Sequence, residues 1–94
     1  MIRLLLSEIA SAVSGELFIA GHSEDMIVSA VSTDSRDLHA GDVFLALKGP
    51  TFDGHDFVEQ AMAINCSAVI VDHQLEKPIN QIIVSDTHKA LGQL

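Results

Sequence analysis

Two polar loops flank one apolar run and carry the side chains best suited to binding a small ligand. The first loop reads TDSR at residues 33–36, and the second reads KGPTFDG at residues 48–54. Cationic side chains bind anions such as phosphates, and hydroxyls bond the polar edges of a ligand. Thr33, Ser35, Arg36 and Lys48 are among the loop residues that offer such groups. We therefore take these loops as a candidate site for a small anionic ligand.

Each of these groups also has a purely structural explanation. Arg36 and Lys48 can be solvated surface residues, and the hydroxyls of the first loop can bond their own backbone as a turn. Phe52 is one of only four aromatic residues, and it can stack on a flat heterocycle or fold back over the following helix. From the residue types alone, both explanations stay open.

The glycines at positions 49 and 54 have the spacing of a nucleoside-triphosphate loop, but the residues that follow do not fit one. That motif continues with Lys and Ser or Thr, whereas this chain continues with His55 and Asp56. The chain therefore lacks the lysine that binds the terminal phosphates and the hydroxyl that binds Mg²⁺. In addition, the carboxylate of Asp53 would repel phosphate. We therefore expect these glycines to serve turn geometry.

The metal-binding and nucleophilic residue types form no recognised pattern. The histidines include no i,i+4 pair and no cysteine partner at metal spacing, and the acidic residues do not follow the calcium-loop pattern. We expect no metal site and no catalytic residue. Cys66 lies between a predicted helix and a predicted strand, where a packed apolar role is expected rather than a nucleophilic one.

The composition is that of an acidic globular domain. The 94 residues are 48% hydrophobic and carry a formal charge of −8. This charge argues against nucleic acid as a partner, because such binding depends on many contacts between basic side chains and phosphates. No apolar run approaches the roughly 18 residues of a membrane helix. The single cysteine excludes an internal disulfide and suits the cytoplasm.

Hydrophobic periodicity predicts strands alternating with short helices, and therefore one α/β domain. Strands are expected at residues 16–20, 26–32, 43–47, 67–71 and 81–84, and helices at 5–13, from Asp53 or Asp56 to 64, and from 87 onward. The first helix can be capped by Ser7 and ended by a left-handed Gly15, and the last can be capped by Asp86. The two loops lie at opposite ends of the strand at 43–47, or at one rim if a neighbouring strand feeds the first loop. The last helix lacks a stop signal, which suggests a fragment of a longer chain.

Together, these segments resemble the N-terminal domain of the Mur ligases, the ATP-dependent amide-forming enzymes that build the peptidoglycan stem peptide. The matching segments are TDSR at 33–36, AGDVFLALKG at 40–49 and DGHDF at 53–57, with Ala61. The opening residues, LSEI at 6–9 and GEL at 15–17, resemble the branch that adds D-alanyl-D-alanine to UDP-N-acetylmuramoyl-tripeptide. The resemblance covers essentially the whole chain and implies a mixed sheet of about five strands flanked by short helices.

In that family the N-terminal domain holds the uridine diphosphate end of the substrate. By resemblance, the residues expected to bind this UDP moiety are Thr33, Ser35, Arg36, Lys48, Pro50, Thr51 and Phe52. The hydroxyls and the segment at 50–52 would contact uracil and ribose, and the two basic residues would lie near the diphosphate. The pair at 50–51 departs from the usual loop content, so contacts there are expected through the backbone. The pair at 65–66 replaces a usual glycine-containing turn, which concerns folding more than function.

The resemblance also implies an enzyme whose catalytic parts lie beyond Leu94. We expect residues 1–94 to be a non-catalytic, substrate-binding fragment. Its expected partners are UDP-N-acetylmuramoyl-tripeptide and its own central ATP-binding domain, with ATP and Mg²⁺ as cofactors of the full-length enzyme. Two alternatives remain open: the same domain of the tripeptide-forming Mur ligase, and a non-catalytic interaction or regulatory domain.

Overall fold

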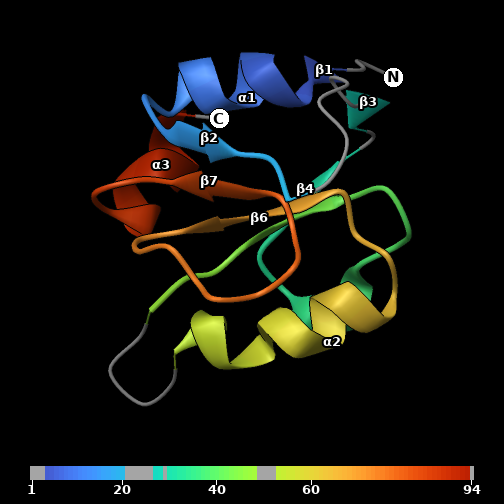
Figure 1. Cartoon of the computed structure of the whole chain (residues 1–94). Helices are drawn as coiled ribbons and strands as arrows, with labels where there is room; N and C mark the ends of the chain where they lie inside the picture. Colours follow the sequence, from blue (N-terminus) through green and yellow to red (C-terminus); the bar gives the residue numbers. More distant parts are fainter. Residues whose placement is uncertain (1–3, 21–26, 29, 49–52, 94) are drawn as a thin grey trace.

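A computed structural model describes residues 4–20, 27–28, 30–48 and 53–93. Within these residues, helices cover both faces of a central five-stranded sheet (Figure 1). The strands lie in the order β2 (Glu16–Phe18), β7 (Gln81–Ile83), β6 (Ala68–Val71), β5 (Val43–Leu45) and β4 (Val31–Ser32). The last four pair in parallel, and β2 pairs antiparallel with β7. The predicted mixed α/β sheet is confirmed.

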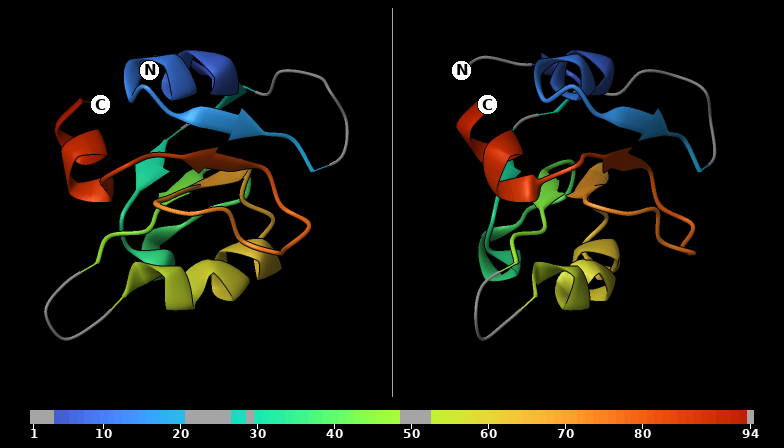
Figure 2. Two further views of the ribbon diagram at one scale, coloured as in Figure 1. Left: turned by 60° about the vertical axis from the view of Figure 1, so that its left-hand side comes forward. Right: turned by 90° about the vertical axis from the view of Figure 1, so that its left-hand side faces the viewer.

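The central strands are buried on both faces, which explains their continuous apolar sequences. Val43 and Leu45 of β5 point into a core shared with α1 (Leu6–Ala12) and α3 (Thr87–Gln93). Phe44 lies between them in sequence and points to the opposite face, into the core beneath α2 (Val58–Ala63). Figure 2 shows the same layers from two other sides. None of the helices in the described residues has the length and apolarity needed to cross a membrane.

The single strand predicted at residues 26–32 is wrong, because this segment forms two strands. β3 (Ile27–Val28) pairs antiparallel with β1 (Leu4–Leu5), in a separate small sheet. β4 joins the main sheet beside β5, and the carbonyl of Ala30 accepts from the backbone N–H of Val43 at 2.9 Å. The two halves pair with different partners, so the backbone must pass from one sheet to the other between them. The apolar pattern of the segment does not encode that change.

Both ends of α1 differ from the prediction. The helix begins at Leu6, and the Glu8 carboxylate accepts a 2.8 Å bond from the backbone N–H of Leu5, so Ser7 is not the N-cap. At the other end Ser14, not Gly15, adopts the left-handed conformation, with φ of 54°. Gly15 is needed for space: a Cβ there would lie 2.5 Å from Ile82 Cγ2. The glycine allows the segment between α1 and β2 to pass close to β7, and the left-handed turn is one residue earlier, at Ser14.

The end of α2 has the same geometry. Asn65 is left-handed, with φ of 58°, and its N–H donates to the carbonyl of Met62 at 3.0 Å. The next N–H, of Cys66, donates to the carbonyl of Ala61 at 3.2 Å. These two bonds form a Schellman motif, in which asparagine is the usual substitute for glycine. The predicted folding role of this pair is confirmed.

Asn65→Gly is expected to raise the free energy of unfolding by up to about 1 kcal/mol, because glycine adopts a positive φ without a Cβ penalty. The matched control is Ala63→Gly at the last helical position of the same helix, where the expected change is a loss of about 0.5–1 kcal/mol. Urea unfolding of the two variants measures both values. Equal destabilisation by both substitutions would contradict the assigned turn.

Candidate functional site

The two polar loops leave the same edge of the sheet. β4 and β5 are adjacent and parallel, with Val31 opposite Val43 and Ser32 opposite Phe44. The chain segments that follow them, 33–42 and 46–57, therefore both start at the carboxyl edge. Of the two arrangements that the sequence left open, this is the one with both loops on one rim. Carboxyl edges of parallel sheets are where α/β proteins commonly bind ligands.

A pocket of about 500 Å³ lies between these two segments. Its described lining residues are Thr33, Asp34, Arg36, Phe44, Leu47, Gly54 and Phe57. Thr33 and Arg36 are two of the residues predicted from the sequence, and they lie here beside apolar side chains. The pocket therefore combines a hydroxyl and a guanidinium with an apolar floor, the composition usual for small-molecule sites.

Arg36 enters the site already paired with Asp34. Its Nε lies 3.1 Å from Oδ1 of Asp34, and its Nη2 lies 3.0 Å from Oδ2. Asp34 also caps the short helix η1 (Ser35–Asp37) by accepting from the Arg36 backbone N–H at 2.9 Å. These bonds from Arg36 lower the pKa of the Asp34 carboxyl. An anionic ligand that binds Arg36 must therefore share or displace this carboxylate.

The first loop does bond its own backbone, as the turn explanation required. Among the described side chains, those of Asp34 and Ser32 do so. The Oγ of Ser32 donates to the Asp34 carbonyl at 3.1 Å and accepts from the Asp34 N–H at 3.2 Å. Thr33 is exposed, and Ser35 contributes its backbone to η1. Ser32 and Asp34 therefore hold the turn in place, and the exposed Thr33 lines the pocket.

In the second loop, Lys48 and Asp53 form an isolated antiparallel bridge. Lys48 is exposed, and it is not among the described residues that line the pocket. Its carbonyl accepts a 2.6 Å bond from Nε2 of His88, which joins this loop to α3. Pro50, Thr51 and Phe52, the remaining predicted binding residues, lie outside the described residues.

Gly54 is required by close backbone packing. A Cβ at this position would lie 2.6 Å from the Leu47 carbonyl oxygen and 2.7 Å from the Leu47 nitrogen. The Gly54 N–H donates to that same carbonyl at 2.6 Å. The expectation of turn geometry is therefore only partly right, since this glycine also brings η2 (Gly54–Phe57) against the end of β5 and closes one side of the pocket.

Phe57 is a pocket residue that lies within the segment predicted to be a single helix. The predicted helix from Asp53 is divided into η2, which Asp53 caps, and α2, whose buried residues are Val58 and Ala61. Phe57 is the last residue of η2 and does not follow the helical pattern of α2. Its side chain is 36% exposed and lines the pocket. A break between a 3-10 turn and an α-helix leaves little trace in apolar spacing.

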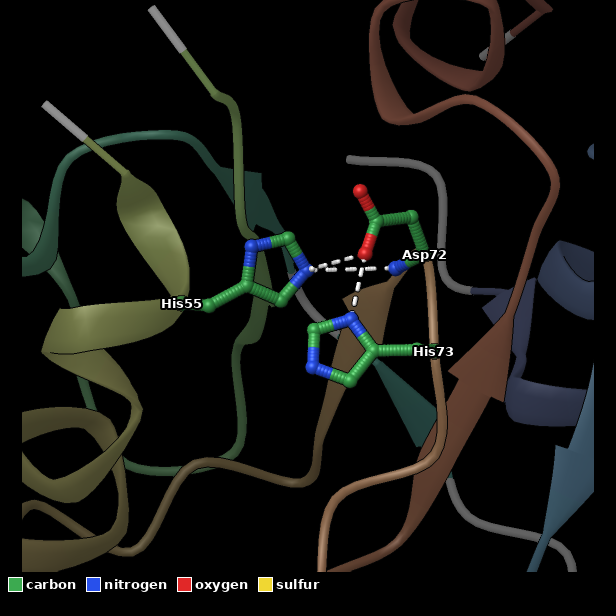
Figure 3. Close-up of side chains that lie close together, drawn as sticks. All are labelled: His55, Asp72 and His73. Carbon is green, nitrogen blue, oxygen red and sulfur yellow. Dashed lines mark hydrogen bonds and ion pairs between the residues drawn. The ribbon is translucent and has the colours of Figure 1, made fainter.

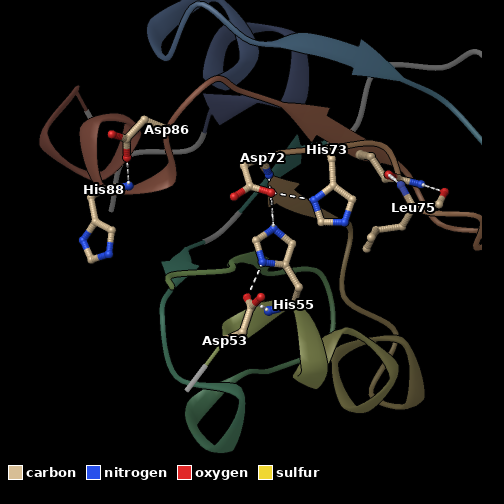
Figure 4. Close-up of polar contacts among 8 residues, drawn as sticks. Asp53, His55, Asp72, His73, Leu75, Asp86 and His88 are labelled. Atoms are coloured by element: carbon tan, nitrogen blue, oxygen red, sulfur yellow. Dashed lines mark hydrogen bonds and ion pairs between the residues drawn. The ribbon is translucent and has the colours of Figure 1, made fainter. Parts of the chain in front are cut away.

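A chain of acidic and histidine side chains also lies at this edge and was not predicted (Figure 4). His55 is linked to Asp53 through Nδ1, at 2.5 Å, and to Asp72 through Nε2, at 3.2 Å. The bonds from His55 lower the pKa of Asp53. Asp72 in turn lies 2.6 Å from Nδ1 of His73. Sequence position could have indicated this group. His55 comes soon after a predicted helix cap, and Asp72 and His73 directly follow a predicted buried strand.

Cys66 has the expected packed role. Its side chain is half-buried against the core beneath α2, and burial raises the pKa of its thiol to about 11. The thiol is therefore protonated at physiological pH, when it is a poor nucleophile.

Gly54→Ala is expected to lower the free energy of unfolding by about 1–3 kcal/mol, because the new methyl group meets backbone atoms that cannot move aside. The control is Gly92→Ala in α3, where a Cβ would meet nothing within 4 Å. That substitution should stabilise the chain by about 0.5–1 kcal/mol. Thermal or urea unfolding distinguishes the two, and a Gly54→Ala variant as stable as the wild type would contradict the close approach.

The pair of Arg36 with Asp34 stabilises the folded state at pH values above the ordinary carboxyl pKa of about 3.9, and this contribution is lost as the pH falls through the lowered folded pKa. We expect Arg36→Gln to raise the Asp34 pKa toward its ordinary value. Titration followed by NMR of the carboxyl carbon measures the pKa of Asp34. Lys77→Gln, which removes a charge paired with Glu59, should leave Asp34 unchanged. An Asp34 pKa insensitive to Arg36 would refute the pairing.

Comparison with known proteins identifies relatives of this chain. UDP-N-acetylmuramoyl-tripeptide–D-alanyl-D-alanine ligase of Escherichia coli K12 is 42% identical over 94 residues, which are 100% of this chain and 20% of that protein. The Bacillus subtilis 168 protein of the same name is 39% identical over 97 residues, again covering the whole chain and 21% of the relative. This chain thus spans about a fifth of the length of these relatives.

Solved structures show the same fold. A crystal structure of MurF from Acinetobacter baumannii superposes with a TM-score of 0.88 at 35% identity, over 99% of this chain and 20% of that one. MurF ligase from Thermotoga maritima in complex with ADP superposes with a TM-score of 0.63 at 29% identity, over 70% of this chain and 16% of that one. Residues 27–94 also match the family described as "Mur ligase family, catalytic domain". This chain belongs to the Mur ligase family.

Proposed function

We propose that this chain is the substrate-holding N-terminal domain of an ATP-dependent ligase that adds D-alanyl-D-alanine to UDP-N-acetylmuramoyl-tripeptide in peptidoglycan synthesis. The support is that relatives with this name align with the chain from end to end. In this proposal residues 1–94 bind the UDP end, and the remainder of the enzyme acts on the distant peptide. Binding energy placed away from the reacting groups serves to position them. The proposed enzyme works in the cytoplasm, which suits its free cysteine.

The observation that carries this proposal is the pocket that joins Thr33 and Arg36 to an apolar wall at the carboxyl edge of the sheet. A uracil ring can lie against the exposed face of Phe57, while a diphosphate can bond the guanidinium of Arg36. Lys48, at the start of the second loop, is exposed and can add a second positive charge. Ser35 and the segment at 50–52 complete the proposed set of binding residues.

ATP and Mg²⁺ are proposed as cofactors of the whole enzyme, and the residues of this chain do not fit them. After Gly54 come His55 and Asp56, so the sequence lacks the lysine and hydroxyl of a triphosphate loop. The Asp53 carboxylate also lies in this loop, bonded to His55. The ATP-binding domain is therefore proposed as a partner of this domain, and the chain alone is expected to have no ligase activity.

A second candidate is the tripeptide-forming branch of the family. UDP-N-acetylmuramoyl-L-alanyl-D-glutamate–2,6-diaminopimelate ligase of Geobacillus kaustophilus is 35% identical over 77 residues, which are 82% of this chain. Both candidates share the UDP end, so the pocket does not separate them. Assay of the full-length enzyme with D-alanyl-D-alanine or 2,6-diaminopimelate as the amine separates them directly.

Arg36→Ala is expected to weaken binding of UDP-N-acetylmuramic acid about tenfold, the effect of losing one charge-assisted hydrogen bond. Stability should change little, because the Arg36 side chain is 86% exposed. Lys89→Ala is the charge-matched control, since Lys89 lines a different cavity beside Val13 and Ser14. Calorimetric titration gives both affinities.

Loss of affinity in both variants would indicate a general charge effect and contradict a local contact. Unchanged affinity in Arg36→Ala would remove Arg36 from the proposed site. No binding by the wild-type chain or by the full-length enzyme would favour a non-catalytic interaction domain and overturn the proposed function.

A further inference from the structure

Three side chains that can ligate a metal converge beside the pocket. His55 lies in η2, and Asp72 and His73 directly follow β6. Their ligand atoms all lie within 4.8 Å of one another. The two imidazole rings stack with their centroids 4.9 Å apart, and both direct a nitrogen at the same Asp72 carboxylate (Figure 3).

The bonds around His55 fix the tautomer that a metal requires. The Asp72 backbone N–H points at Nε2 from 3.2 Å, and because an N–H can only donate, Nε2 must be the acceptor. The ring proton then lies on Nδ1, where it donates to the Asp53 carboxylate at 2.5 Å. A carboxylate behind a histidine is the usual outer-shell support of a metal ligand, since it orients the ring and raises its basicity.

The distance from His55 to Asp72 already fits a tetrahedral centre, and the exposed ring of His73 has room to adjust. With bonds of about 2.0–2.1 Å, two ligand atoms on one zinc ion lie roughly 3.3 Å apart. His55 Nε2 is already 3.2 Å from Asp72 Oδ1, and His73 Nδ1 is closer, at 2.6 Å. The His73 side chain is 60% exposed, so its ring can move outward and transfer its Nδ1 proton to Nε2 through water. On binding a metal through Nε2, His55 would lose only the 3.2 Å hydrogen bond that it accepts from the Asp72 backbone N–H.

We propose that His55, Asp72 and His73 form a binding site for a borderline divalent transition metal of the Zn²⁺ class, with Asp53 as the outer-shell partner of His55. Two imidazoles and one carboxylate favour such ions over Mg²⁺ or Ca²⁺, which prefer oxygen ligands. Water would complete the fourth position. This proposal does not depend on the proposed ligase function.

A metal here would link two segments that are far apart in sequence. His55 follows Gly54, which lines the pocket, while Asp72 and His73 begin the connection from β6 to β7. Bound metal would hold η2 against the sheet edge and stabilise the fold, because any ligand that binds only the folded state raises its stability.

The test is calorimetric titration of the EDTA-treated chain with Zn²⁺ at neutral pH, with thermal unfolding in parallel. We expect one ion per chain and a higher Tm with Zn²⁺, whereas excess Mg²⁺ should give neither. His73→Ala should weaken binding at least about tenfold, and Asp53→Asn about 10–100-fold. The matched control is His39→Ala, which removes another exposed histidine beside an aspartate, Asp42, at 3.7 Å.

NMR of the wild-type chain supplies the second measurement, so a poorly folded variant would not decide the result. Zn²⁺ should shift the ring signals of His55 and His73, and leave those of His39 unchanged. The proposal is overturned if millimolar Zn²⁺ produces neither heat nor shifts. It is also overturned if His39→Ala lowers the affinity as much as His73→Ala does, because that outcome indicates unspecific binding to an acidic surface.

Discussion

Parallel hydrogen bonding among β4, β5, β6 and β7 is the constraint on which the candidate sites depend. It brings the carboxyl ends of four strands to one edge, where the segments that follow them start, at Thr33, Ala46, Asp72 and Val84. The central strands are buried on both faces, with α1 and α3 on one side and α2 on the other. Gly54 then lets the backbone after β5 return against Leu47, which completes the pocket wall.

Several charged groups at this edge of the described residues already have partners, in a chain whose formal charge is −8. Arg36 is paired with Asp34, and His55 lies between Asp53 and Asp72. A ligand that binds here must therefore replace or join an existing interaction. This favours ligands that make several contacts at once, as a nucleotide diphosphate or a multiply coordinated metal ion does, over a simple anion attracted by net charge.

Much of the fold could be predicted from the sequence, because buried strands and capped helices have local signatures. The predicted strand at 43–47 is found as the shorter β5, Val43–Leu45. Asp53 caps the turn η2 ahead of the helix, and Asp86 accepts from the backbone at the start of α3. Features that depend on distant partners could not be predicted. The separation of β3 from β4 follows from their pairing in different sheets, and Gly15 is required by its close approach to Ile82. Likewise, Thr33 and Arg36 were visible as loop groups, whereas Phe57 and the pair of His55 with Asp72 emerge only from the packing.

The central claim is that the pocket at the carboxyl edge holds the UDP end of a UDP-linked muropeptide. Amide shifts in the NMR spectrum during titration with UDP-N-acetylmuramic acid test it most directly. The predicted result is a set of shifts centred on residues 33–36, Leu47 and Phe57, with the α1 face unchanged. Shifts centred instead on the cavity lined by Val13 and Lys89 would contradict the claim.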